Sequence, residues 1–183
     1  MRDSKAALRA SVRASRAGTS LVEEDRARLA HVLDWLPTTP GVAATYLSIT
    51  DEPDTRGLVD ALVARGWEVR LPLLTREPDW ARFAGWDQLR PAWRGIPEPT
   101  TPALGARSLA QCRVVVASCL LVDREGYRLG VGGGWYDRAL AHRGDATVLA
   151  FARDEECVER VPREPHDVPC DGWATGSGVT VVR

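Results

Sequence analysis

The sequence predicts a single α/β domain, in which helices flank a mostly parallel or mixed central sheet. Residues 41–49 and 67–74 have the composition of strands, and a helical pattern over 55–65 separates them. Residues 112–122 form a continuous apolar run, which is typical of a buried central strand. The chain has 183 residues, of which 44% are hydrophobic. Residues 1–183 can therefore bury roughly two-thirds of their surface as one domain.

The chain begins with a predicted basic helix over residues 3–17. Lys5, Arg9 and Arg13 recur every four residues, so they share one face of this helix. A solvated helix surface is the commoner meaning of such a stripe. Of the 24 basic residues, however, only Lys5 is a lysine. A coding bias towards arginine explains the others, and either chance or a need for a compact ammonium group explains Lys5.

The next two helices have recognisable ends. Ser20 and Glu23 match a capping box, so we expect a helix over about 20–36 that serves as core scaffolding. The helix over 55–65 is expected to stop at Gly66, since glycine commonly ends a helix. With the strands on either side, this second helix completes a βαβ unit, which favours parallel strand pairing.

The second half of the chain alternates between irregular segments and short regular ones. Residues 75–111 contain five prolines, which predict ordered loops and short strands. After the apolar strand over 112–122, we expect a helix over about 134–142. Residues 147–152 and 179–183 have the composition of further strands.

Composition excludes several classes of protein. The formal net charge of −1 gives no support for binding nucleic acid or an anionic membrane. No run of about 18 apolar residues exists, and the N-terminus lacks the apolar core of a signal peptide, so we expect a cytoplasmic protein. No heptad pattern indicates a coiled coil, and we expect a monomer. Four scattered cysteines indicate neither a zinc site nor a disulfide framework, so we expect reduced thiols at Cys112, Cys119, Cys157 and Cys170.

The most informative segment is "RLGVGGGWYD" at residues 128–137. A strand that runs through a glycine-rich turn into a helix is suited to bind phosphate, because bare backbone N–H groups can converge on the anion. Asp137 lies in the first turn of the expected helix, where it could bind a metal that bridges phosphates, and Arg128 could neutralise further charge. The alternative is a tight bulge, with Asp137 merely favourable to the helix dipole. Four glycines in five positions favour an anion site, and these are Gly130, Gly132, Gly133 and Gly134.

This loop matches neither common nucleotide-binding fingerprint. In a G-x-G-x-x-G motif the last glycine would fall at Trp135, and no Lys-Ser or Lys-Thr pair follows as in a P-loop. The loop also lies late in the chain, whereas a Rossmann fingerprint occupies the first βα turn.

Four separated blocks give the chain a family resemblance. They are "KAALR" at 5–9, "YLSITDEPDT" at 46–55, "RLGVGGGWYDR" at 128–138 and "VPREPHDVPCD" at 161–171. In order and spacing they resemble the 5-formyltetrahydrofolate cyclo-ligase family, also called methenyltetrahydrofolate synthetases. The family fold is a single α/β domain, in agreement with the pattern above. At Trp135 the family usually has a tyrosine, so stacking on a flat ring would survive there but any role of a hydroxyl would not.

The resemblance implies a role for each matching residue. The ATP-binding residues would be Lys5, Arg9, Arg128, Leu129, Gly130, Val131, Gly132, Gly133, Gly134, Trp135 and Tyr136. Lys5, Arg9, Arg128 and Tyr136 would act in catalysis, and Leu47, Glu52, Trp93, Trp135 and Tyr136 would contact the folate. Asp137 and Asp167 would bind Mg²⁺. A loop-packing role is equally open for Trp93, and we expect His166 to be a structural partner rather than a base.

The implied reaction joins N10 of 5-formyltetrahydrofolate to its formyl carbon, with ATP as co-substrate and Mg²⁺ as cofactor. An N5-iminium phosphate would be the intermediate. Two alternatives remain: a diverged relative that activates a different amide with ATP, and a module that binds nucleotide or folate without turnover. The combined presence of Lys5, Arg9, Asp137 and Asp167 favours an enzyme, since a pure binder would not need the whole set.

Overall fold

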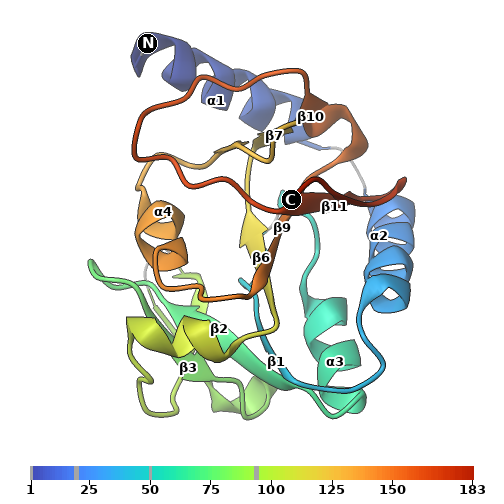
Figure 1. Ribbon diagram of the computed structural model, residues 1–183, viewed down its shortest axis with the longest axis vertical. Helices are drawn as coiled ribbons and strands as arrows, with labels where there is room; N and C mark the ends of the chain where they lie inside the picture. Colours follow the sequence, from blue (N-terminus) through green and yellow to red (C-terminus); the bar gives the residue numbers. More distant parts are fainter. Residues whose placement is uncertain (1, 19–20, 50, 93–94) are drawn as a thin grey trace.

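A seven-stranded mixed sheet runs through the molecule (Figure 1). The computed structural model describes residues 2–18, 21–49, 51–92 and 95–183. In spatial order the strands are β12 (Gly178–Val181), β11 (Gly172–Thr175), β9 (Thr147–Phe151), β6 (Val114–Ser118), β1 (Val42–Ala44), β2 (Glu68–Leu73) and β3 (Asp79–Arg82). The five inner strands pair in parallel, whereas β12 and β3 are antiparallel edge strands. The predicted fold class is therefore confirmed.

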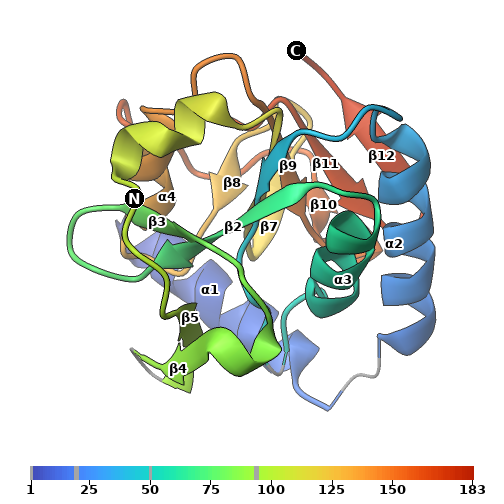
Figure 2. The ribbon, with the colours of Figure 1, turned by 90° about the horizontal axis from the view of Figure 1, so that it is seen from below.

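Helices cover both faces of this sheet. α2 (Val22–Trp35) and α3 (Arg56–Ala64) lie on one face, and α4 (Trp135–Leu140) lies on the other with the 3₁₀ helix η3 (Ala106–Gln111) (Figures 1 and 2). Successive side chains of β6 point to opposite faces of the sheet, and each face is covered by helices. Val114 and Val116 join the core beneath α2 and α3. Val115 and Ala117 instead join the core beneath α4 and η3. Both faces of the strand are thus buried, as its continuous apolar sequence requires.

A smaller sheet lies beyond the end of β6 and supports the first helix. Its strands are β10 (Cys157–Val158), β7 (Leu121–Asp123) and β8 (Arg128–Leu129). α1 (Arg2–Arg16) packs on it through Val12, which contacts a cluster that includes Leu121, Leu129 and Val161. The remaining short elements are η1 (Trp86–Gln88), η4 (Asp154–Glu156) and the hairpin of β4 (Leu89–Pro91) with β5 (Pro97–Pro99). None of the described helices is long and apolar enough to cross a membrane.

Two predicted strands are shorter in the structure than the sequence suggested. The strand expected over 41–49 ends at Ala44, because beyond it a side chain takes the place of the backbone partners of a neighbouring strand. Thr55 Oγ1 donates to the Tyr46 carbonyl and accepts from the Ser48 N–H. The strand expected over 112–122 divides into β6 and β7. Between them the chain leaves the large sheet, and the Leu120 N–H bonds to the carbonyl of Leu129 in the small one.

The structure also differs from the sequence-based prediction in one strand and in the ends of two helices. β11 was not predicted, because it is only four residues long and begins with glycine. α2 begins at Val22, after an N-cap residue, Leu21, whose side chain makes no capping hydrogen bond; Ser20 lies outside the described residues. α4 spans six residues and ends at Leu140, two residues before the expected end.

Gly126 provides a test of this architecture. It lies in the turn between β7 and β8 at φ +84°, and its carbonyl accepts the Cys170 N–H at 2.8 Å. A Cβ at this position would overlap the Cys170 carbonyl oxygen. We expect Gly126→Ala to lower the free energy of unfolding by about 1–2 kcal/mol for the left-handed backbone and by about 1–3 kcal/mol more for the overlap.

Gly66→Ala is the matched control, to be measured with it by urea unfolding. Gly66 has a similar φ of +81°, but a Cβ there would make only an ordinary contact with Pro40. It should therefore show the backbone cost alone. Equal losses of stability in the two variants would contradict the close approach of the turn to Cys170.

Candidate active site

The glycine-rich loop lines a cavity of about 530 Å³. α1 contributes side chains from one side, and the segment before Cys170 contributes them from another. The lining residues are Lys5, Arg9, Arg128, Leu129, Gly130, Gly132, Gly133, Gly134, Asp137, Arg138, Glu164, His166 and Asp167. The structure thus gathers at one place residues from three of the four blocks recognised in the sequence. We call this the loop cavity.

The loop itself presents bare backbone to the cavity. Gly132 and Gly134 have φ of +111° and +61°, a region that side chains rarely adopt. Arg9 reaches across from α1, and its Nε donates to the Gly130 carbonyl at 2.8 Å. Val131 is 57% exposed, and it is not among the residues that line the cavity.

α1 turns a mixed polar and apolar face towards the body of the protein. Lys5 is buried, and its Nζ donates to Asp167 Oδ2 at 2.9 Å and lies 3.8 Å from Glu164 Oε2. Arg13, which the predicted stripe placed on the same face, is instead exposed. The helix therefore delivers Lys5 and Arg9, but not Arg13, to the loop cavity.

Arg128 forms a second ion pair at the cavity. One of its Nη atoms donates to Asp137 Oδ1 at 2.8 Å, and the other donates to the Val168 carbonyl at 2.5 Å. The Val168 N–H also bonds to Asp137 Oδ1, at 3.2 Å. The Arg128 side chain is only 3% exposed, so this pair is held in a low-dielectric environment.

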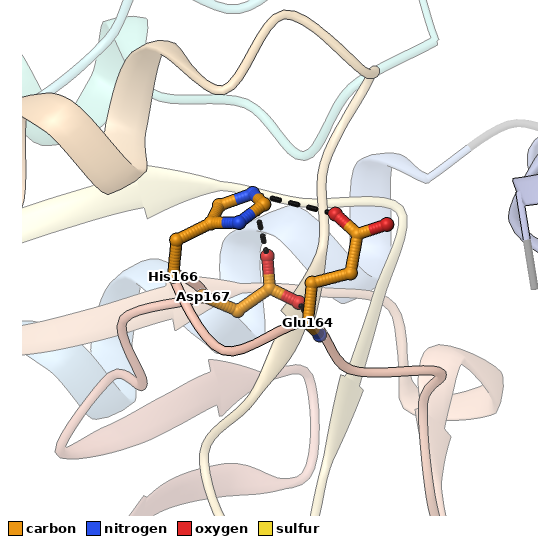
Figure 3. A group of neighbouring side chains, drawn as sticks. All are labelled: Glu164, His166 and Asp167. Atoms are coloured by element: carbon orange, nitrogen blue, oxygen red, sulfur yellow. Dashed lines mark hydrogen bonds and ion pairs between the residues drawn. The ribbon is translucent and has the colours of Figure 1, made fainter.

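Glu164, His166 and Asp167, all of types that can bind a metal ion, lie together in the wall of the loop cavity (Figure 3). Glu164, His166 and Asp167 each offer a ligand atom, and these atoms lie within 4.8 Å of one another. Burial raises the pKa of Asp167, but hydrogen bonds from Lys5 and from the Glu164 N–H outweigh it and leave the pKa below its ordinary value. The carboxylate is thus held in the ionised form that a cation requires. His166 Nε2 lies 3.3 Å from Glu164 Oε2, and the His166 side chain is 69% exposed.

Two of the residues predicted to contact folate, Leu47 and Glu52, follow the carboxyl end of β1. Leu47 is buried, and Glu52 lines a separate cavity of about 600 Å³ with Ser48, Ile49, Arg56 and others. Glu52 Oε2 accepts the Ile49 N–H at 3.1 Å, and burial raises the pKa of this carboxyl. Trp93 lies outside the described residues.

Trp135 and Tyr136 pack between the loop and the sheet. The Trp135 ring meets Trp80 edge-on at 5.3 Å and Tyr136 at 5.2 Å between centroids. The Tyr136 hydroxyl lies 3.4 Å from the Val116 carbonyl. Burial raises the pKa of Tyr136, and the negative charge of Glu52 raises it further. Neither ring is among the residues that line the loop cavity or the cavity that contains Glu52.

Arg138 and Glu164 line this cavity but were not predicted as site residues. Glu164 lies beside Lys5 and His166, yet it was overlooked in the sequence. The sequence clue to Glu164 was its place in the run of charged residues around Pro165. An acid three positions before Asp167 can lie in the same turn as Asp167, and the Glu164 N–H donates to Asp167 Oδ2 at 2.7 Å.

Comparison with known proteins agrees with the geometry. The model of the 5-formyltetrahydrofolate cyclo-ligase family matches residues 1–176. A 5-formyltetrahydrofolate cyclo-ligase of Mycolicibacterium smegmatis is 37% identical over 130 residues, which cover 67% of this chain and 67% of that protein.

Two solved structures extend the likeness to the fold. The NMR structure of Aquifex aeolicus 5,10-methenyltetrahydrofolate synthetase has a TM-score of 0.82 at 28% identity, and the match covers 98% of this chain and 93% of that one. A Mycoplasma pneumoniae 5,10-methenyltetrahydrofolate synthetase shares the fold, with a TM-score of 0.75 at 18% identity and coverage of 94% and 98%. From its sequence, its site and these relatives, the chain belongs to the 5-formyltetrahydrofolate cyclo-ligase family.

Proposed function

We propose that this protein uses ATP to convert 5-formyltetrahydrofolate to 5,10-methenyltetrahydrofolate, with release of ADP and phosphate. The supporting observation is the convergence in the loop cavity of the cations Lys5, Arg9 and Arg128 with the carboxylates of Asp137 and Asp167. Bare loop amides and several cations suit a polyphosphate, and carboxylates suit the metal ion that accompanies it.

The chemistry explains why a polyphosphate is needed. The formyl group is an amide, and its oxygen is a poor leaving group. The formyl oxygen attacks the γ-phosphorus of ATP, and the bond from that phosphorus to the ADP oxygen breaks. This gives an N5-iminium phosphate and ADP. N10 then attacks the formyl carbon, the C–O bond breaks, and phosphate leaves with the N10 proton.

Such a transfer needs positioning and charge neutralisation more than a covalent nucleophile. Lys5 and Arg9 would turn from Asp167 and from the Gly130 carbonyl towards phosphate oxygens. Arg128 would neutralise charge from the floor of the cavity, where Asp137 orients it. The loop amides from Leu129 to Tyr136 would surround the γ-phosphate.

The donor set also fits Mg²⁺, which prefers carboxylate oxygens. Asp167 and Asp137 would hold it, and Glu164 lies close enough to Asp167 to assist. When bound, the ion would neutralise phosphate oxygens. In the structure Lys5 pairs with Asp167 and Arg128 pairs with Asp137.

The folate would bind on the Glu52 side of the site. Glu52 would accept hydrogen bonds from the pterin ring, and Leu47 would contact it. Trp135 and Tyr136 would stack on the ring, while stacking and loop packing remain equally open roles for Trp93. Tyr136 also lies within the electrostatic influence of Glu52, which supports placing both at one end of the substrate.

We further propose that residues 1–183 act as one domain, as a monomer, on small molecules in the cytoplasm. In support, the large sheet takes strands from Val42 to Val181, and the family model spans nearly the whole chain.

Turnover by the purified protein is the primary test. With Mg²⁺, ATP and 5-formyltetrahydrofolate, the strong near-ultraviolet absorbance of the methenyl product should appear, and it should not appear without ATP. ATP hydrolysis provoked only by another amide would instead indicate a diverged relative. Binding of both ligands without turnover would indicate a sensor.

Asp137→Asn tests the metal assignment. The asparagine oxygen can still accept from Arg128 and Val168, so we expect the free energy of unfolding to fall by only about 1–2 kcal/mol. Loss of the negative charge should lower kcat about 100-fold or more. Asp34→Asn, which removes an exposed carboxylate on α2, is the control. A fully active Asp137→Asn enzyme would refute the assignment.

Replacement of Lys5 tests the need for a compact ammonium group. The side chain is 10% exposed and is enclosed by Asp167 and Glu164, so a planar guanidinium should not fit the same place. Lys5→Met and Lys5→Arg should both raise the KM for ATP about 10-fold. Arg13→Met, an exposed change on the same helix, should leave it unchanged. A normal KM in Lys5→Arg would show that any cation suffices.

A further inference from the structure

The end of α1 that points away from the loop cavity is fixed by a buried ion pair. Arg16 Nε donates to Glu156 Oε1 at 2.6 Å, and its Nη2 donates to Glu156 Oε2 at 2.8 Å. The same Nη2 donates to the Cys119 carbonyl at 2.8 Å. Both side chains of the pair are 3% exposed, so this two-point contact is shielded from water and directional.

Glu156 also connects to the segment that contains Glu52. Its Oε2 accepts the backbone N–H of Arg153 at 2.9 Å. The Arg153 side chain, 1% exposed, continues the path: its Nη2 donates to the carbonyl of Asp51 at 3.2 Å. Asp51 immediately precedes Glu52. One carboxylate therefore links the helix of Lys5 and Arg9 to the segment expected to bind the pterin ring. We call Arg16, Glu156 and Arg153 the bridge.

Stability alone does not explain the bridge. It holds two buried guanidinium groups against one buried carboxylate, and Arg153 Nε and Nη1 have no hydrogen-bond partner among the described residues. Burying charges in this way costs several kcal/mol, and apolar side chains of similar volume are often at least as stabilising. The arrangement is better explained by what it positions.

The pKa of Glu52 also indicates that Arg16 is linked to the Glu52 segment. Burial raises the pKa of this carboxyl, while the Ile49 N–H and the charge of Arg16 oppose the rise. Arg16 is thus close enough to act on Glu52, although the two residues lie on different elements. α1 therefore influences both halves of the site, through Lys5 and Arg9 at one end and through Arg16 at the other.

We propose that Glu156 and Arg153 are positioning residues, which fix α1 and the Glu52 segment relative to each other so that the γ-phosphate and the formyl group meet. The inference rests on the proposed function. When Lys5 and Arg9 exchange their present partners for phosphate, the pair of Arg16 with Glu156 remains as the fixed point of α1. Arg153 holds the Glu52 segment at a set distance from that point.

Arg153→Met is the decisive variant. It removes the bond to the Asp51 carbonyl but leaves Arg16 paired with Glu156, and it removes two unpartnered polar atoms. The thermal midpoint should therefore be unchanged or higher. We expect the KM for 5-formyltetrahydrofolate to rise about 5-fold or more, with the KM for ATP unchanged.

Glu156→Gln should affect both substrates. It weakens the hold on Arg16 and on Arg153 together, so both KM values should rise about 5-fold or more. Glu159→Gln is the matched control, because it removes an exposed carboxylate, paired with the exposed Arg124, three residues along the same segment. It should leave both KM values unchanged.

The outcomes separate this inference from the proposed function. A wild-type protein that does not cyclise 5-formyltetrahydrofolate overturns the function itself. An active wild type, together with a stable Arg153→Met variant of normal folate KM, overturns the positioning role. Equal rises of both KM values in Arg153→Met would also overturn it, because Arg153 should act on the folate side alone.

Discussion

The site depends on a single buried carboxylate, that of Asp123 at the end of β7. Its side chain is fully buried, and both oxygens are satisfied. Oδ1 accepts the N–H groups of Glu125 and Tyr127, and Oδ2 accepts the Val161 N–H and an Arg163 Nη. A buried charge is tolerated only when it is paired and hydrogen-bonded in this way. The four bonds fix the turn before β8 against the segment that leads to Glu164, His166 and Asp167. The glycine loop and this later segment can therefore form one cavity.

Within that cavity every predicted cation already has a protein partner. Lys5 pairs with Asp167, Arg9 bonds to the Gly130 carbonyl, and Arg128 pairs with Asp137. A cavity rich in unpaired positive charge would destabilise the free protein by self-repulsion. Here the charges are held in place in advance, so a phosphate ligand exchanges existing partners instead of ordering loose side chains. Affinity then reflects the difference between the two sets of contacts.

Helical periodicity predicted part of this arrangement from the sequence. Lys5 and Arg9 do share the inner face of α1, but the same spacing wrongly included Arg13. The inner face is instead continued by Val12 and Arg16, because four residues span slightly more than one full turn of a helix, so a spacing of four drifts off the face. Arg16 gave no signal, since its partner Glu156 lies 140 residues away. Local patterns predict which face of an element is buried, whereas contacts between distant segments depend on the sheet order.

Trp135 shows what a departure from the family pattern means physically. Its ring packs edge-on against Trp80 and Tyr136, and its indole nitrogen is buried without a hydrogen-bond partner in the described part of the chain. A tyrosine hydroxyl and an indole N–H both lose water at this depth, so the replacement does not remove a desolvation cost. The tryptophan ring contributes contact with Trp80 and Tyr136, and the adjacent Tyr136 hydroxyl retains the contact with the Val116 carbonyl. The position therefore contributes through packing between the glycine loop and the sheet, and a flat ring without a hydroxyl is sufficient for that.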